Sequence, residues 1–186
     1  MRVIAGTARS LVLKTPEGLN TRPTTDRIKE TLFNVLQTEV PGAVFVDLFA
    51  GSGGIGIEAL SRGAEKAYFV DTDKTAIGCI EYNLKHTKLF DKSMVLKSDA
   101  ISALSYNIRE TADIIFADPP YGQGFDEQVL AAAARSKAVT EDTLIVIEEE
   151  KDHDFSYAEE LGFDIVKEKV YKSNKHVFLK RKAKTD

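Results

Sequence analysis

The feature that most constrains the fold is a repeated alternation of short apolar runs with stretches of helical spacing. The apolar runs lie at 43–49, 67–70, 94–96, 114–117 and 143–147. Apolar runs this short are typical of buried strands, and the stretches between them have the length of crossover helices. The alternation therefore predicts an α/β fold with a mostly parallel sheet and right-handed connections.

The two ends of the chain depart from this alternation. Residues 1–20 have the pattern of a small β-hairpin, and two strand-like runs within 163–180 flank the turn-prone pair Ser173-Asn174. Antiparallel pairing of the last two runs would close the sheet at one edge. We therefore expect a β-hairpin extension at residues 1–20, followed by one α/β domain at residues 21–186.

Four of the apolar runs have an aspartate at or near their end. These residues are Asp47, Asp71, Asp99 and Asp118. Because the carboxyl ends of parallel strands meet at the edge of the sheet where α/β proteins bind ligands, we expect the four carboxylates to line one cleft. Their mutual repulsion favours a cleft that holds a cation or hydrogen-bond donors. S-adenosylmethionine, a sulfonium with ribose hydroxyls and an amino group, has this chemistry.

A glycine-rich segment follows the first of these aspartates. Gly51, Gly53 and Gly56 match the G-x-G-x-x-G pattern of dinucleotide-binding proteins, and Asp71 lies 20 positions beyond Gly51. An NAD(P)-dependent oxidoreductase is therefore an alternative interpretation. Two observations favour S-adenosylmethionine: no Lys or Arg lies between residues 47 and 61 to assist a pyrophosphate, and the strand ends are acidic. An oxidoreductase would also need a substrate domain, for which the chain has no room.

The segment Asp118-Pro119-Pro120-Tyr121, here named the claw, follows the apolar run 114–117. Proline fixes φ and has no N–H to donate, so the carbonyls of this segment are free to accept hydrogen bonds from a ligand. The Asp118 carboxylate and a claw carbonyl would accept both hydrogens of a planar amino group, while Tyr121 stacks on the attached ring. This arrangement indicates chemistry on the exocyclic amine of a nucleobase, with Gly122–Gly124 as a lid. The simpler alternative is a strand followed by a proline-rich turn.

Composition bounds the class of protein. The chain has 186 residues, 43% of them hydrophobic and 29% charged, as in a globular protein with one core. No run of 18 apolar residues and no secretory signal is apparent, and the single cysteine, Cys79, fits a reducing compartment, so we expect a cytoplasmic protein. The histidines, His86, His153 and His176, lack metal-ligand spacing, and we expect no metal.

The net charge of −4 is distributed unevenly. Residues 1–30 carry +3 and residues 161–186 carry +5, which leaves −12 on residues 31–160. A helix predicted after residue 25 would pack its apolar stripe on the sheet and leave basic side chains off that stripe. These basic residues are Arg22, Arg27 and Lys29. Solvated surface charge is the simpler explanation of each cluster, but the contrast between ends and middle favours ends that face a nucleic acid.

These motifs together resemble those of the bacterial 16S ribosomal RNA guanine-N2 methyltransferases, a family of class I S-adenosylmethionine-dependent methyltransferases. The resemblance covers nearly all of the chain, and its most specific segments are 22–27 (RPTTDR) and 30–34 (ETLFN). Residues 47–53 resemble the family's cofactor loop, and the claw resembles its catalytic motif. The start of the chain also resembles the family's, with Ala5 and Ser10 where glycines are usual.

The resemblance implies a role for each candidate residue. The methionine part of the cofactor would be held by Asp47, Ala50, Gly51 and Gly53, the ribose by Asp71, and the adenine by Asp99 and Ala100. The catalytic residues would be Asp118, Pro119 and Tyr121. The substrate, 16S rRNA of the small subunit or its assembly intermediate, would contact Arg9, Arg22, Arg27, Pro120 and Tyr121. Asp71 and Asp99 are alternatively helix N-caps, with Asp73 and Ser98 as the cofactor contacts.

The implied mechanism is direct methyl transfer to a flipped-out guanine, whose N2 amine is held by Asp118 and a claw carbonyl. Ionised Asp118 would stabilise the positive charge that develops on the amine and accept the released proton. Three other interpretations remain open beside the oxidoreductase: an adenine-N6 methyltransferase, a glutamine-N5 methylase, and a ribosome-assembly factor without activity. The acidic first residue of the claw argues against the last two.

Overall fold

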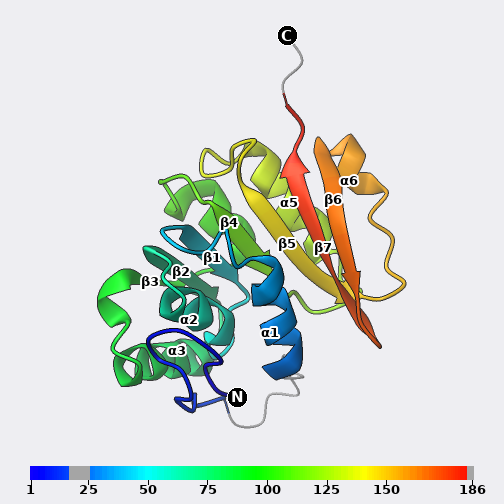
Figure 1. Cartoon of the computed structure of the whole chain (residues 1–186). Coiled ribbons are helices and arrows are strands. Elements are labelled where there is room, and N and C mark those ends of the chain that lie inside the picture. Colours follow the sequence, from blue (N-terminus) through cyan, green and yellow to red (C-terminus); the bar gives the residue numbers. More distant parts are fainter. Residues whose placement is uncertain (17–25, 184–186) are drawn as a thin grey trace.

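A computed structural model describes residues 1–16 and 26–183 and has one seven-stranded sheet in the order β3-β2-β1-β4-β5-β7-β6 (Figure 1). The strands are β1 (Val44–Leu48), β2 (Lys66–Asp71), β3 (Ser93–Lys97), β4 (Ile114–Ala117), β5 (Leu144–Glu150), β6 (Phe163–Val170) and β7 (Asn174–Arg181). The helices are α1 (Asp26–Val35), α2 (Gly54–Ser61), α3 (Lys74–His86), α4 (Ala100–Ser102), α5 (Phe125–Arg135) and α6 (Tyr157–Glu160), with short turns η1 (Phe90–Lys92) and η2 (Ala103–Asn107).

The predicted fold class is confirmed. Strands β1 to β5 pair in parallel, whereas β7 pairs antiparallel with β5 and with β6, so the C-terminal hairpin closes one edge of the sheet. The chain runs outward from β1 to β3 and then returns to β4 on the other side of β1. The carboxyl ends of β1 and β4 therefore flank the point where the strand order reverses, which is where open α/β sheets bind ligands.

Apolar side chains cover both faces of the sheet. One core cluster joins α1, α2 and α3 to the sheet through residues such as Leu32, Ile57, Phe69 and Ile80. The other joins α4, η2, α5 and α6 to the opposite face, as in the packing of Leu104 and Val129. Figure 1 shows α1 to α3 on the near face and α5 on the far face. Burial on both sides explains why the central strands are continuous apolar runs.

The first sixteen residues lie along α2 and α3 rather than apart from them (Figure 1). An antiparallel bridge joins Arg2 to Val12, so the predicted hairpin is present but has a single bridge instead of two full strands. Val3, Ala8 and Leu13 of this segment are at most 3% exposed and belong to the α1–α3 core. The segment is thus part of the folded core.

Two backbone positions fix the path of this segment. Gly6 has φ of +83°, and a side chain there would place its Cβ 1.8 Å from the Ser61 carbonyl oxygen, so only glycine fits. Ser10 also has a positive φ, 71°, which is costly for a residue with a Cβ. Glycine would adopt this conformation freely. This is a physical reason why a glycine would be expected at position 10 from the family resemblance.

One predicted surface residue is buried. Lys29 was expected off the apolar stripe of α1, on its outer face, but its side chain is 0% exposed. Its Nζ donates to the Arg2 carbonyl oxygen at 2.5 Å and lies 3.3 Å from Glu58 Oε2. The prediction was wrong because the N-terminal segment covers this side of α1, and a helical pattern read alone does not show that cover.

Candidate active site

The glycine loop and the claw meet at the carboxyl ends of β1 and β4. Leu48 of β1 pairs in register with Ala117 of β4, so residues 49–53 and 118–121 leave the sheet side by side. Leu48 also pairs with Val70 of β2, so Asp71 and Asp118 directly follow the two register partners of the residue after Asp47. Three of the four predicted aspartates are therefore brought together at this edge.

The carboxylates of Asp47 and Asp71 accept hydrogen bonds from the glycine loop and from the first turn of α2. Asp71 Oδ2 accepts a hydrogen bond from the Gly51 N–H at 2.9 Å, and Asp47 Oδ2 accepts one from the Gly56 N–H at 2.9 Å. Asp47 is 2% exposed, and burial raises its pKa well above the usual range, although the Gly56 N–H acts in the opposite direction. These contacts fix the loop, and no contact with a cofactor is needed to explain them.

The loop is strained at one position and tightly packed at another. Phe49 adopts φ of +59°, an unfavourable conformation for an aromatic residue, directly after β1. A Cβ at Gly56 would lie 2.4 Å from the Phe69 ring, so this glycine permits close packing of α2 on β2. The N–H groups of the first helical turn favour a negatively charged group, and at Gly56 of α2 the Asp47 carboxylate provides it.

The alternative reading of two acids as helix caps is partly confirmed. Asp99 caps α4 by accepting from the Ser102 N–H at 2.8 Å, and this bond lowers its pKa. The cap of α3 is Asp73, not Asp71: Asp73 Oδ1 accepts from the N–H groups of Thr75 and Ala76. Ala100 lies in the first turn of α4 and is buried. Contact of Asp99 and Ala100 with an adenine stays a prediction.

The claw is positioned by the end of β4. Pro119 is buried, Pro120 is exposed, and Tyr121 is half-buried outside both core clusters. The Tyr121 hydroxyl donates to Glu148 Oε1 at 2.9 Å. This bond fixes one end of the ring.

Asp118 has no hydrogen-bond partner among residues 1–16 and 26–183. Burial raises its pKa well above the usual range, and the charges of Glu148, Asp47 and Glu149 raise it further. A carboxyl group in this state favours the neutral form, and a cation or a donor entering the cleft would favour ionisation instead. Strongly perturbed acids of this kind are concentrated at functional sites.

Sequence reasoning missed Glu148 and its partners on β7. Glu148 Oε1 accepts from Asn174 Nδ2 at 2.6 Å, and Oε2 accepts from His176 Nε2 at 2.9 Å. The hydrogen bonds and charge of His176 hold the pKa of Glu148 below its usual value despite burial. A signal was present, because three glutamates follow the apolar run at the end of β5, but only aspartates were considered.

Two of the three arginines that were predicted to contact RNA lie in the described part of the chain. Arg9 and Arg27 are exposed, and no ion pair involves either of them in the part of the chain that the structure describes. Arg22 lies outside the described residues. Asp26, next to Arg27, pairs with Arg2 at 3.3 Å, and both side chains of this pair are exposed.

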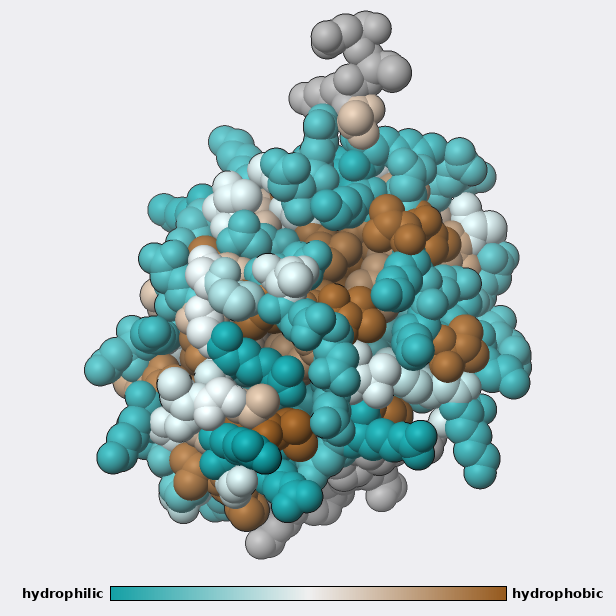
Figure 2. Space-filling model, in the orientation of Figure 1, coloured by the Kyte–Doolittle hydropathy of each residue, from teal (hydrophilic) through white to brown (hydrophobic). Residues whose placement is uncertain are grey.

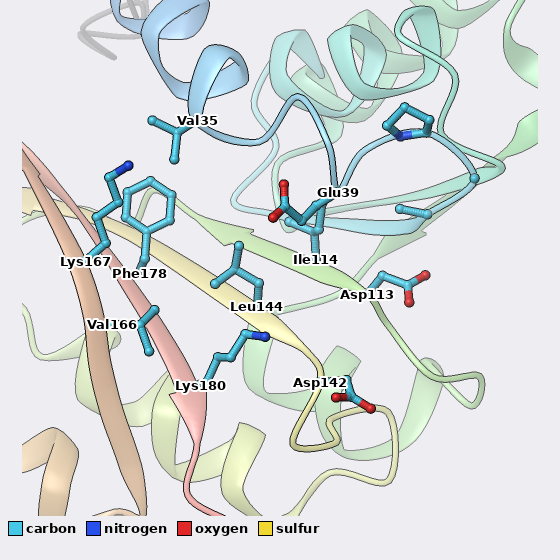
Figure 3. A pocket seen from close by; sticks show the side chains of 13 residues that line it. Val35, Glu39, Asp113, Ile114, Asp142, Leu144, Val166, Lys167, Phe178 and Lys180 are labelled. Atoms are coloured by element: carbon cyan, nitrogen blue, oxygen red, sulfur yellow. The ribbon is translucent and has the colours of Figure 1, made fainter.

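A pocket of about 510 Å³ lies elsewhere, between α1 and the C-terminal hairpin (Figure 3). Its walls include Val35, Ile114, Leu144, Val166 and Phe178. Ile114 and Leu144 are the first residues of their strands, so this pocket is at the amino edge of the sheet, opposite the claw. Figure 2 shows the apolar surface in this region. The pocket therefore has no part in the chemistry of the claw.

Asp126, Glu149 and His153 form another cluster, near the start of α5, with potential ligand atoms within 4.8 Å of one another. His153 Nε2 lies 2.6 Å from Asp126 Oδ2, and the Tyr157 hydroxyl donates to the same oxygen. Two ligand atoms that each lie about 2.1 Å from one metal ion are farther apart than the two hydrogen-bonded atoms of His153 and Asp126. A hydrogen-bonded network is the simpler account of the cluster.

The fold and the site define a class I methyltransferase: an open sheet of this order, a glycine loop after β1 and an acidic claw after β4. The chain matches the family described as Conserved hypothetical protein 95 over residues 1–180 and belongs to that family. Among the described residues, no helix is long and apolar enough to cross a membrane.

Individual relatives agree with this class. YlbH from Bacillus subtilis, named as a proposed rRNA methyltransferase, is 41% identical over 82% of this chain and 84% of its own. Ribosomal RNA small subunit methyltransferase D from Haemophilus influenzae is 36% identical over 82% of this chain and 80% of its own. A solved Escherichia coli structure, yhhF, described as a proposed methyltransferase, superimposes with a TM-score of 0.87 at 33% identity, covering 99% of each chain.

Proposed function

We propose that this chain transfers a methyl group from S-adenosylmethionine to the exocyclic N2 of a guanine in 16S ribosomal RNA. The observation that carries the proposal is the claw, which leaves the sheet beside the glycine loop and contains a carboxyl group without a partner among the described residues. Relatives named ribosomal RNA small subunit methyltransferase D in Haemophilus influenzae and Escherichia coli support the choice of RNA.

The residues of the cleft fit a cationic cofactor. Burial raises the pKa of both Asp47 and Asp118, the charge of Asp71 raises that of Asp47 further, and a positive group in the cleft would relieve this repulsion. Gly51 and Gly53 would contact the methionine part through a loop that Asp71 holds, and Asp71 has lone pairs left for ribose hydroxyls. Ala50, Asp99 and Ala100 complete the proposed binding site. The cofactor would supply an electrophilic methyl group attached to its sulfonium.

The chain's own residues would orient the amine and manage its proton. Asp118 accepts one N–H of the guanine N2 group, a claw carbonyl accepts the other, and Tyr121 stacks on the base beside the exposed Pro120. With a positive group in the cleft, the pKa of Asp118 falls, and the ionised carboxylate stabilises the charge that develops on N2. The same carboxylate then receives the released proton. The buried Pro119 keeps the claw rigid.

An assay of methyl transfer to ribosomal RNA, followed by nucleoside mass spectrometry, tests the reaction. We expect N2-methylguanosine, with free RNA compared against the assembled small subunit as substrate. Methylated adenosine would instead support the adenine-N6 alternative. Calorimetric titration separates the cofactors: binding of NAD without binding of S-adenosylmethionine would contradict the proposal and favour an oxidoreductase.

RNA would be held by the N-terminal extension, residues 1–20, and by α1, next to the methyltransferase domain at 21–186. Arg9 and Arg27 are exposed and, among the described residues, free of ion pairs, and Arg22 is proposed from the sequence alone. Neutralising all three should reduce the slope of log K against log salt by roughly 1 for each lost phosphate contact. The same slope in the wild-type and triple-variant proteins would contradict this assignment.

A further inference from the structure

We infer that Glu148 is a positioning residue for methyl transfer: together with Asn174 and His176 it fixes the hydroxyl of Tyr121, and so the orientation of the claw ring that receives the base. This inference rests on the proposed function and extends it to the C-terminal hairpin. Strand β7, which closes the sheet, would thereby support the substrate site.

The geometry of the network is complete on the Glu148 side. Its Oε1 accepts from the Tyr121 hydroxyl at 2.9 Å and from Asn174 Nδ2 at 2.6 Å, and its Oε2 accepts from His176 Nε2 at 2.9 Å. On the other side of the imidazole, the Tyr171 hydroxyl lies 3.1 Å from His176 Nδ1. Each oxygen of Glu148 is therefore directed by a fixed donor.

The donors themselves are held rigidly. His176 is 0% exposed, with the Phe116 ring edge-to-face at 5.8 Å and the Tyr171 ring at 5.0 Å. Glu148 and His176 are also partners in the β5–β7 register, as Glu150 and Asn174 are. Both donors come from one strand whose position is fixed by a backbone ladder, which is the kind of support that a precisely oriented site residue needs.

A purely structural role explains this network less well. A buried acid that only stabilised the hairpin would need the β7 donors alone, whereas Glu148 also binds the side chain that directly follows the claw prolines. In addition, the charge of Glu148 adds to burial in raising the pKa of Asp118, as do the charges of Asp47 on β1 and Glu149 on β5. It therefore acts on both functional side chains of the claw.

Three variants separate these effects. Glu148→Ala removes both the acceptor and the charge, and should lower kcat by about 10- to 100-fold with little change in the affinity for S-adenosylmethionine. Glu148→Gln keeps an acceptor for Tyr121 and should restore most of the lost kcat. Tyr121→Phe keeps the stacking ring but removes the hydroxyl, and should reproduce part of the loss. The exposed residue Glu150 on the same strand gives the control, Glu150→Gln, which should leave kcat unchanged.

The double variant Tyr121→Phe/Glu148→Ala tests whether Glu148 acts through Tyr121. We expect it to be little slower than Glu148→Ala alone, because residues that work as a unit are not additive. Fully additive losses, or wild-type kcat in Glu148→Ala, would overturn the inference.

A change in pH dependence is expected for Glu148→Gln, which removes the negative charge but keeps an acceptor for Tyr121. Its titratable neighbours are His176 and Tyr171 toward β7, Tyr121 and Asp118 toward the claw. Because loss of its negative charge lowers the pKa of Asp118, the acid limb of the kcat–pH profile should move to lower pH. An unchanged profile would contradict the inference.

Hydrogen exchange at residues 121–124 provides a readout that needs no activity. These amides should exchange faster in Glu148→Ala than in wild type, while β1 and β2 keep their protection. Unchanged exchange overturns the inference whatever the substrate is. Absence of methyl transfer by the wild-type protein, with faster exchange in the variant, would instead contradict the proposed function. The inference that Glu148 fixes the Tyr121 hydroxyl would still hold. If Glu148→Ala does not fold, Tyr121→Phe carries the same exchange test.

Discussion

Two acidic side chains, Glu58 on α2 and Asp118 at the end of β4, have opposite surroundings: Glu58 is fully buried, whereas Asp118 is half-buried. Glu58 is 0% exposed and accepts from the N–H groups of Ile4 and Ala5, from Arg62 Nε, and lies 3.3 Å from the Lys29 ammonium. Asp118 has no such partner in residues 1–16 and 26–183, and its nearest charges are those of other carboxylates.

The difference separates a structural acid from a functional one. A buried charge that is fully hydrogen-bonded holds segments together, and here Glu58 joins the N-terminal segment to α1 and α2. A half-buried acid without partners and with a raised pKa costs stability at neutral pH, so its presence needs another explanation, such as a ligand that completes the site. Glu58 should therefore matter for folding and Asp118 for turnover.

The largest effect is expected for Glu58→Ala. The substitution leaves the buried Lys29 ammonium without its counter-charge, with the Arg2 carbonyl as its remaining acceptor, and removes the acceptor of two part-buried backbone N–H groups. The loss should lower the free energy of unfolding by about 3–5 kcal/mol. Urea unfolding measures it. The matched control is Glu159→Ala, whose carboxylate pairs with Lys182 at the surface and should change stability by about 0–1 kcal/mol. Equal effects of the two variants would contradict the structural role of Glu58.

Asp118→Ala should show the opposite pattern. It removes the group that orients and stabilises the amine, so turnover should fall by roughly 100-fold or more, about 2.7 kcal/mol in the barrier. The affinity for S-adenosylmethionine and the thermal midpoint should stay close to wild type. A purified variant with wild-type turnover would contradict the mechanism, and a large fall in stability would place Asp118 in the same class as Glu58.

Asp71 stands between these two cases, because it holds the Gly51 N–H and is also proposed to bind the ribose. Asp71→Ala should weaken the cofactor by on the order of 1–3 kcal/mol through lost hydrogen bonds, as measured by calorimetry. Asp73→Ala is the matched control: it removes the cap of α3, which costs about 0.5–2 kcal/mol of stability, and should spare cofactor affinity. A greater loss of affinity in the control would transfer the ribose contact to Asp73.

The same two regions show how far the sequence leads. The parallel sheet, the C-terminal hairpin and the meeting of the glycine loop with the claw follow from local periodicity and from the rule that strand ends share an edge. Contacts between segments that are distant in the sequence do not follow from local periodicity. Nothing local indicates that Lys29 is buried against Glu58, since a lysine on a helix is normally solvated and the cover comes from residues 1–16.

Glu148 illustrates the same limit at the active site. Its hydrogen bonds join the claw to β7, which inserts between β5 and β6, and the order of those strands is a property of the whole sheet. The N-cap of α3 was also wrongly placed by the alternative interpretation of Asp71, because Asp71 ends β2 and holds the Gly51 N–H, while Asp73 caps the helix. Residue types near the strand ends were predictable, and the partners of each carboxylate were not.

The smallest effect is expected for stability in Asp118→Asn, and its sign distinguishes the two acids most directly. The pKa of Asp118 is raised in the folded protein, whereas in the unfolded chain it is about 3.9. Below about pH 4 both states are protonated and Asp118 contributes nothing; as the pH rises, the unfolded state ionises first, so the native protein loses stability. Asn keeps the shape but never ionises, so the variant should be more stable than wild type at neutral pH, with a gain that vanishes toward pH 4.

Urea unfolding at a series of pH values, without cofactor, measures this difference, and Asp142→Asn at an exposed position should show no comparable gain. If Asp118→Asn is instead less stable at neutral pH, Asp118 has a stabilising partner like that of Glu58, and the contrast between the two acids fails.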